Sequence, residues 1–375
     1  MNIEKYLNQL GKNSVEASSK IKSLKLEEKN SLLESISKSI IDDKSDIIKA
    51  NNIDVEEAKE KLSESMIDRL QLNEERIDGI IQSIETVIAL PDPIGNILFT
   101  NTRPNGMKVE RVSVPLGVVG IIYESRPNVT VDASILCLKS GNSVILRGGS
   151  ESFNSNLQLV KTMQRACGNI GLDKNIIQFI ETIDRSAVDY MLSKMSDYID
   201  VVVPRGGKGL VKKVQESAKI PVIGHLDGIC HVYVDESSDP EAASKIVTNA
   251  KLRRTSICGA AETVLIDEKC IDSHLPKIIK DLKSGGCEIR GDERCKNKFD
   301  EVVLASDEDW KTEYLEAIIS IKIVSGVEDA IDHIEKYGSG HTESIISENK
   351  DSVEKFLNSV GSAIVMHNTS TQFAD

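Results

Sequence analysis

The first ninety residues carry apolar side chains at helical spacing. They recur every three or four positions, with Lys and Glu between them: Leu32, Leu33, Ile36, Ile40, Ile41, Ile47 and Ile48. This period is typical of helices that bury one apolar stripe. The stretch has no proline, and its only glycines are Gly11 and Gly79, before Pro91 and Pro93 interrupt the pattern. We therefore predict a run of amphipathic helices over residues 1–90, with the charged face in solvent.

From about residue 107 the pattern changes to short Val- and Ile-rich runs that alternate with helical stretches. The runs predict strands at 118–123, 143–146, 176–179, 199–203, 232–234, 263–266 and 318–324. The stretches between them predict helices at 155–166, 208–217, 240–248 and 275–283. Regular alternation of strand and helix favours α/β domains with largely parallel sheets.

Composition and charge exclude several classes of protein. The 375 residues are 40 % hydrophobic and 28 % charged, which suits a packed chain of two or three domains. A formal charge of −13 argues against a nucleic-acid-binding protein. No apolar run approaches the ~18 residues of a membrane span, and the polar N-terminus has no apolar signal core. We expect a cytoplasmic protein with neither a nucleic-acid nor a membrane partner.

The cysteines and histidines predict neither disulfides nor a metal site. The seven cysteines are odd in number and form no C-x-x-C, and the six histidines are scattered, without H-E-x-x-H. Six of the cysteines stand in apolar or amphipathic contexts, which is typical of buried small hydrophobic residues.

Three glycine-rich stretches lie beside predicted strands, at 115–120, 147–151 and 204–209, and bring Arg147, Arg205 and Lys208 with them. Backbone N–H groups at such turns can cradle a phosphate. None of the stretches matches G-x-G-x-x-G or the P-loop, and a glycine after a strand also makes a tight turn without any ligand. Three such turns with basic neighbours in one α/β region favour a nucleotide.

Cys258 is the candidate nucleophile. It lies among small residues in the run 255–261, with Arg253 and Arg254 five and four positions before it. The thiolate is the nucleophilic form of cysteine, and neighbouring positive charge favours it. Small neighbours also leave room for a substrate carbonyl.

Several segments together resemble the γ-glutamyl phosphate reductases, a branch of the aldehyde dehydrogenase superfamily. The run 114–130, which contains Glu-Ser-Arg-Pro-Asn-Val-Thr, is specific to this branch. The other similar segments are 138–151, 203–207, 224–228, 249–263, 339–343 and 369–375. The resemblance covers nearly the whole chain.

The resemblance implies an aldehyde dehydrogenase-like α/β fold with a Rossmann-type cofactor domain, a catalytic domain and a small oligomerisation element. Residues 1–224 would hold the N-terminal helices and the NADP-binding domain, with a β-hairpin near 107–123. Residues 225–360 would form the catalytic domain, and residues 361–375 would return to the cofactor and oligomerisation region, where the family pattern is cut short. The implied reaction is NADPH-dependent reduction of L-glutamyl 5-phosphate to L-glutamate 5-semialdehyde and phosphate through a cysteine thioester. It is the second step of proline biosynthesis from glutamate.

The resemblance also implies roles for single residues. Cys258 would be the nucleophile, and the Asn128 amide would hold the oxyanion, although a plain turn residue after Pro127 is the alternative there. Glu313 would hold the nicotinamide ribose, with a solvated carboxylate as the alternative. The remaining cofactor-binding candidates are Arg147, Gly148, Gly149, Gly206 and Gly207. The substrate-binding candidates are Glu124, Arg126, Arg253, Arg254 and His341.

His225 marks a departure from the wider superfamily. Hydrolytic members place a glutamate there that activates water for deacylation, and an acyl phosphate reductase gains by lacking it. A histidine can itself act as a base near neutral pH, so the residue alone leaves the point open.

Two other functions remain as alternatives. A CoA-acylating aldehyde dehydrogenase also lacks the deacylating glutamate, but the 124–130 run argues against it. A non-catalytic assembly protein on the same fold is opposed by the retention of Cys258 and Asn128. The resemblance further implies a homo-oligomer, and the lability of the acyl phosphate makes direct transfer from a glutamate kinase a hypothesis.

Overall fold

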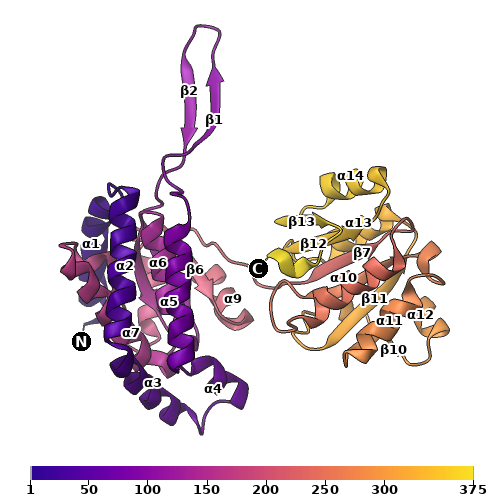
Figure 1. Cartoon of the computed structure of the whole chain (residues 1–375), viewed down its shortest axis with the longest axis horizontal. Helices are drawn as coiled ribbons and strands as arrows, with labels where there is room; N and C mark the ends of the chain where they lie inside the picture. The colour runs from indigo at the N-terminus through magenta and orange to yellow at the C-terminus, as the bar shows by residue number, and fades with distance from the viewer. Residues whose placement is uncertain (1, 375) are drawn as a thin grey trace. The chain divides into compact units, whose positions relative to one another are not determined.

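The computed structural model describes residues 2–374 and divides into two compact units, Met1–Gly224 and His225–Asp375. Each unit has its own parallel sheet and its own apolar core (Figure 1). The predicted α/β class is therefore confirmed. All seven predicted strands are present, with ends that differ by at most two residues, and the four predicted helices differ by at most four.

Five helices open the first unit, as the apolar period predicted. They are α1 (Ile3–Ile21), α2 (Leu26–Asp42), α3 (Lys44–Ala58), α4 (Glu64–Leu70) and α5 (Glu74–Ala89). Leu32, Leu33, Ile36 and Ile40 of α2 are fully buried. Ile41, which shares the apolar pattern, is 52 % exposed, because it lies about 100° around the helix from Ile40. Helix α5 ends at Ala89, before Pro91, since the residue before a proline disfavours helix.

A four-stranded parallel sheet forms the centre of the first unit, in the order β5-β4-β3-β6. Its strands are β3 (Val118–Tyr123), β4 (Ser143–Arg147), β5 (Ile177–Phe179) and β6 (Val201–Arg205), and its helices are α6 (Asn128–Lys139), α7 (Phe153–Asn169), α8 (Ser186–Lys194) and α9 (Lys208–Ser217). The chain runs outward from β3 to β5 and then crosses to β6 on the other side of β3. The order of the strands thus reverses between β3 and β6, the place where open α/β sheets bind ligands at the carboxyl ends of their strands.

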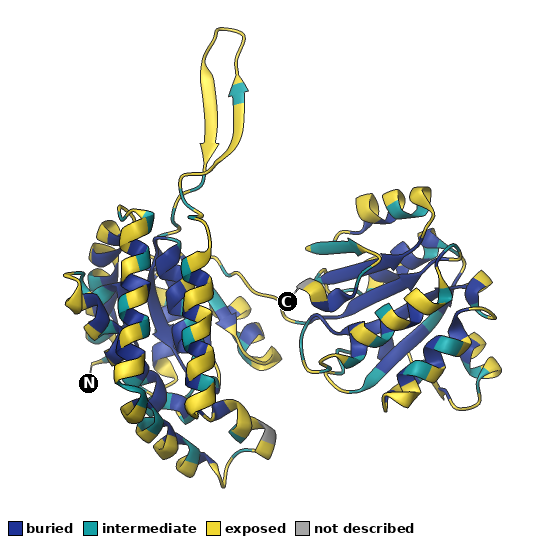
Figure 2. Cartoon of the chain, viewed as in Figure 1, coloured by how far each residue is buried: buried dark blue, intermediate teal, exposed yellow. Residues whose placement is uncertain are grey.

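A two-stranded antiparallel hairpin extends from this unit, formed by β1 (Ile97–Thr102) and β2 (Lys108–Val112) (Figures 1 and 2). The expectation of a hairpin near 107–123 is corrected: residues 118–123 form the fully buried central strand β3. The hairpin instead uses 97–102, a run whose apolar residues are largely exposed and so gave no burial pattern. Ile97, Leu98 and Phe99 are each more than half exposed.

The second unit is built on a seven-stranded parallel sheet in the order β10-β9-β11-β8-β7-β12-β13. The strands are β7 (Cys230–Val234), β8 (Ala261–Asp267), β9 (Glu288–Gly291), β10 (Val303–Leu304), β11 (Ile318–Val324), β12 (Thr342–Ile346) and β13 (Ile364–His367). The helices are α10 (Pro240–Leu252), α11 (Leu275–Ser284), α12 (Glu293–Lys298), α13 (Val327–Tyr337) and α14 (Lys350–Ser359). Figure 2 shows most strands of the two parallel sheets buried beneath partly exposed helices, whereas β1 and β2 are exposed.

The last segment differs from its expectation. Residues 361–375 were expected to return to the cofactor region, but β13 pairs in parallel with β12 and extends the sheet of the second unit. The short helix Thr371–Ala374 follows it, with Thr371 and Gln372 buried in the same unit.

The ion pair between Lys251 and Glu262 is fully buried in the second unit. Lys251, at the end of α10, donates through Nζ to the carboxylate of Glu262 on β8, and both side chains have zero exposure. Burial raises the pKa of Glu262 to about 7, although Lys251 acts against the rise. The pair brackets residues 252–261, the segment that contains Cys258.

Removing one partner of this pair should destabilise the second unit. We expect Lys251→Met to lower the free energy of unfolding by about 3–5 kcal/mol, because it leaves a buried carboxylate unpaired. The double variant Lys251→Met/Glu262→Leu should recover most of the loss, because no charge remains buried. Urea unfolding can be followed by fluorescence of Trp310, the chain's single tryptophan, which is buried in the same unit.

The control for this experiment is Lys245→Met on the same helix. The Lys245 side chain is 73 % exposed, so its loss should change stability by no more than about 0.5 kcal/mol. A loss below about 1 kcal/mol in Lys251→Met would contradict the role given to the buried pair.

Candidate active site

Cys258 differs from the other six cysteines in its exposure. It lies in the loop between α10 and β8 and is partly exposed, whereas the rest are buried, as predicted. Burial raises the pKa of Cys137, Cys167, Cys270 and Cys295 to about 12 each, so those four remain protonated at neutral pH. Among the seven sulfurs, Cys258 is therefore the one that the fold offers to a substrate.

Two histidines converge on Cys258. One ligand atom of each of His225, Cys258 and His341 lies within 4.8 Å of the other two, and the two imidazole rings meet edge to face with centroids 4.6 Å apart. The three residues stand shortly before β7, β8 and β12, which are neighbouring parallel strands. Parallel strands put their amino ends at one edge of a sheet, so residues far apart in sequence meet there.

The backbone of the cysteine loop is held very close to the segment before β7. A side chain at Gly228 would place its Cβ 2.2 Å from the carbonyl oxygen of Cys258, so only glycine fits. The N–H of Gly228 donates to Oε1 of Glu313 at 2.9 Å, and the thiol of Cys230 donates to the Cys258 carbonyl at 3.1 Å. Glu313, predicted to contact the cofactor ribose, is thus engaged with the backbone beside the cysteine loop.

Gln372 is a residue of this region that the sequence analysis missed. Its side chain is buried, and Nε2 donates to the carbonyls of Ala250 at 2.7 Å and Arg254 at 3.2 Å. These carbonyls belong to the end of α10 and the start of the cysteine loop, where helix carbonyls lack helical partners. The only sequence signal was the membership of Gln372 in the family-like run 369–375.

In the first unit, the predicted residues gather at the carboxyl edge of the sheet. Glu124 follows β3, and its Oε2 accepts from the N–H of Gly207 at 2.8 Å, at the amino end of α9. A Cβ at Gly206 would come within 2.6 Å of the same carboxylate. An anionic group thus already sits where a helix N-terminus after a strand would bind phosphate, at the point where the strand order reverses.

The turn after β4 approaches the same edge. Glu151 accepts from the N–H of Ser125, and a Cβ at Gly148 would lie 2.1 Å from Nδ2 of Asn156. Arg147 is buried, donates only to the backbone carbonyls of Gly148 and Ile183, and its Nε has no hydrogen-bond partner among the described residues. A buried guanidinium with an unsatisfied N–H suits an anionic ligand such as a nucleotide phosphate.

Asn128 is the first residue of α6, just beyond the carboxyl end of β3, and not a residue of an isolated turn. Its Nδ2 donates to Asp132 one helical turn later, at 2.9 Å. A side-chain amide has two N–H groups, and this bond uses one of them. Burial raises the pKa of Asp132, with the Asn128 bond acting in the opposite direction.

The predicted arginines differ in environment. Arg126 is half-buried near the guanidinium groups of Arg69 and Arg205, and burial and their like charge lower its pKa. Arg253 and Arg254 are exposed on the loop that leads to Cys258. The glycine-rich stretch 115–120 has a packing role instead: Gly117 has φ +123° and lies against the carboxylate of Asp200.

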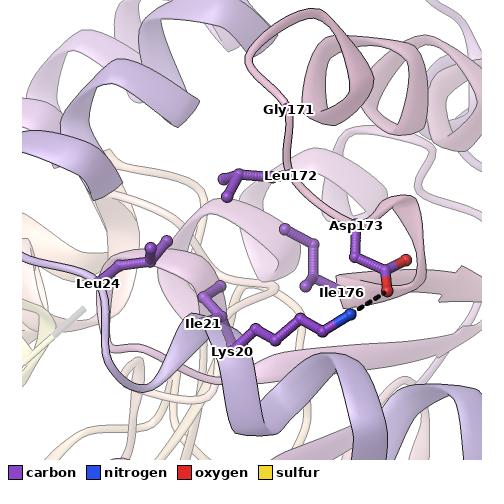
Figure 3. A pocket seen from close by; sticks show the side chains of 7 residues that line it. All are labelled: Lys20, Ile21, Leu24, Gly171, Leu172, Asp173 and Ile176. Atoms are coloured by element: carbon purple, nitrogen blue, oxygen red, sulfur yellow. Dashed lines mark hydrogen bonds and ion pairs between the residues drawn. The ribbon is translucent and has the colours of Figure 1, made fainter.

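A surface pocket lies elsewhere in the first unit (Figure 3). It is lined by residues of α1 and of the segment between α7 and β5, and Lys20 and Asp173 form an ion pair across it at 3.3 Å. None of the predicted site residues lines it, so we give it no part in the chemistry.

The chain is similar to known proteins over nearly its whole length. Residues 4–295 match the model of the aldehyde dehydrogenase family. A γ-glutamyl phosphate reductase of Bartonella tribocorum is 52 % identical over 350 residues, which are 93 % of this chain and 85 % of the relative. The crystal structure of a γ-glutamyl phosphate reductase from Thermotoga maritima is 43 % identical, with a TM-score of 0.95 over 98 % of this chain and 89 % of that one.

A more distant structure shares the fold alone. A propionaldehyde dehydrogenase of Rhodopseudomonas palustris, solved with bound CoA and an acylated cysteine, is 16 % identical, with a TM-score of 0.67 over 97 % of this chain and 88 % of that one. None of the described helices has the length and apolar character needed to cross a membrane. On the strength of the family match and of relatives about half identical over nearly its whole length, the chain belongs to the γ-glutamyl phosphate reductases of the aldehyde dehydrogenase family.

Proposed function

We propose that this chain reduces L-glutamyl 5-phosphate to L-glutamate 5-semialdehyde and phosphate with NADPH, the second step of proline biosynthesis from glutamate. The observation that carries the proposal is the partly exposed Cys258 in a loop held at both ends, in a chain about 50 % identical to γ-glutamyl phosphate reductases. Membership of the aldehyde dehydrogenase family implies a nicotinamide cofactor.

Cys258 performs the covalent step in this proposal. Its thiolate attacks the acyl carbon, the bond from that carbon to the phosphate oxygen breaks, and phosphate leaves with the bonding electrons. The thioester that remains on Cys258 is a carbonyl electrophile, and a nicotinamide cofactor, when bound, would supply the hydride for its reduction. The carbon–sulfur bond then breaks to release the aldehyde and the thiolate. Dividing a difficult step in two through a covalent intermediate is the general use of a nucleophilic cysteine.

The neighbouring groups are proposed to support this step. Asp132 holds the Asn128 amide through one N–H, and the other N–H would donate to the oxyanion of the reacting acyl group. That hydrogen bond would become stronger as negative charge develops on the oxygen. A nitrogen of His225 and one of His341 each lie within 4.8 Å of the sulfur, and either imidazole would have to move into hydrogen-bond reach to take up its proton. Arg126, Arg253 and Arg254 remain candidates for the phosphate and carboxylate of the substrate.

The residues of the first unit fit the cofactor. The unsatisfied Nε of Arg147 suits the extra phosphate that distinguishes NADPH from NADH. The N–H of Gly207 already donates to the carboxylate of Glu124, so it could donate to a pyrophosphate oxygen if Glu124 turned away. At the same edge of the sheet, a Cβ would clash with neighbouring side chains at each of Gly148, Gly149 and Gly206.

Assembly into a homo-oligomer is part of the proposal. An isolated two-stranded ribbon is marginally stable in water, yet β1 and β2 leave Ile97, Leu98 and Phe99 largely exposed. A second copy of the chain that covers the hairpin would remove this exposed apolar surface.

The reverse reaction tests the chemistry directly. With glutamate 5-semialdehyde and NADP as substrates, NADPH should form only when inorganic phosphate is present, because phosphate must cleave the thioester. Absorbance of NADPH, read with phosphate, with CoA or with neither, separates the outcomes. Turnover with CoA in place of phosphate would instead support a CoA-acylating enzyme, and turnover with water alone would support a hydrolytic dehydrogenase.

Chemical labelling tests the nucleophile. Brief treatment of the folded chain with iodoacetamide should add one carbamidomethyl group, at Cys258, because burial keeps the other thiols protonated and covered. Cys258→Ala should remove that label and abolish turnover while the cofactor still binds. The unfolded chain, with all seven cysteines accessible, is the control for mass spectrometry. Unchanged turnover in Cys258→Ala would eliminate the covalent mechanism.

Arg147→Ala tests the preference for NADPH. We expect the KM for NADPH to rise about 10- to 100-fold, the effect of losing one charge-assisted contact, with a much smaller change for NADH. Arg165→Ala, on α7 of the same unit, removes an arginine that pairs with Asp43 and should leave both values unchanged. An equal rise for the two cofactors would contradict the role given to Arg147.

A further inference from the structure

The cluster of His225, Cys258 and His341 has the donor set of a metal site. It offers one sulfur and two imidazole nitrogens, all within 4.8 Å of one another. A tetrahedral Zn²⁺ bound at ~2.3 Å to sulfur and ~2.1 Å to nitrogen separates its ligands by about 3.5 Å. Each pair of these three atoms therefore needs to approach by about 1.3 Å at most, and three protein ligands leave one coordination position of the metal open.

The surroundings of the cluster allow such an ion to enter and be held. His225 is exposed, and Cys258 and His341 are partly exposed, so solvent reaches the ligands and their side chains can adjust. The hydroxyl of Thr342 lies 2.8 Å from Nδ1 of His341 and orients that ring, as outer partners of ligating histidines do. Sulfur with imidazole is a donor set that prefers Zn²⁺ and similar soft or borderline cations to Mg²⁺ or Ca²⁺.

We propose that His225, Cys258 and His341 form a reversible site for a thiophilic divalent cation, with Zn²⁺ as the probe, and that the bound ion blocks Cys258. In binding, the thiol loses its proton to solvent and the sulfur donates a lone pair to the metal. No electron is transferred, so a chelator restores the original state. The blocking effect rests on the proposed function, because it needs Cys258 to be the nucleophile, but the binding itself does not.

The test is direct binding of Zn²⁺ to the full chain, measured by competition with a chromogenic chelator. We expect one ion per chain. Cys258→Ala, His225→Gln and His341→Gln should each weaken binding about tenfold or more. His367→Gln is the matched control, because His367 is an exposed histidine of the same unit outside the cluster, and this variant should bind as tightly as the unmodified chain. Unchanged affinity in Cys258→Ala, or in both cluster histidine variants, would overturn the site.

A second measurement, the absorption spectrum with Co²⁺, tests the site without relying on enzyme activity or on the affinity for Zn²⁺. Co²⁺ in place of Zn²⁺ should give a thiolate-to-metal absorption band in the unmodified chain that is lost in Cys258→Ala, and a chain that shows no such band overturns the proposal. Zn²⁺ should also abolish NADPH turnover, and a chelator should restore it. If the metal binds as predicted but the chain reduces no acyl phosphate, the proposed function fails and the site stands. If turnover is normal and insensitive to Zn²⁺, the inhibitory site fails and the function stands.

Discussion

The parallel pairing of β7 with β8 and β12 is the constraint on which the candidate active site depends. These three strands are neighbours in the seven-stranded sheet, and their amino ends lie at the same edge. His225, Cys258 and His341 each precede one of them, so the register of the sheet brings together two imidazoles and a sulfur. A shift in that register would move the two imidazoles and the sulfur apart, even with all three side chains unchanged.

The loop that contains Cys258 is fixed by contacts that leave its sulfur accessible. The buried pair of Lys251 and Glu262 ties the end of α10 to β8, and Gln372 holds the carbonyls of Ala250 and Arg254 from the other side. In the middle, the close approach of Gly228 fixes the backbone carbonyl of Cys258. All these contacts involve buried groups or backbone, so the sulfur gains a defined position without being covered. A nucleophile needs this combination, because a small displacement of the sulfur from its position against the reacting carbon lowers the reaction rate steeply.

The sequence was sufficient for the α/β class and the helical N-terminal region, and the cysteine that it singled out, Cys258, is the one that the structure leaves partly exposed. These features depend on local period and on the small and basic neighbours of one cysteine, which are visible in a single chain. It was insufficient for the cluster around the sulfur, because His225 and His341 are distant in sequence and meet only through the strand order. It also misplaced the hairpin, since β3 has the strongest apolar run of the region but lies at the centre of a sheet. Gln372 was missed because hydrogen bonds from one buried amide to two carbonyls leave no periodic signal.

Parallel strands also bring the candidate residues of the first unit together, but at the carboxyl ends of the strands. Here the candidate residues follow their strands, and Glu124 after β3 meets Gly207 after β6 at the point where the strand order reverses. The N-terminus of α9 attracts negative charge, and without a ligand it is satisfied by a carboxylate from the same unit. A phosphate at this position would compete with Glu124 for the N–H of Gly207. The competition follows from the charge of Glu124, since a neutral side chain would be held less strongly at the N-terminus of a helix.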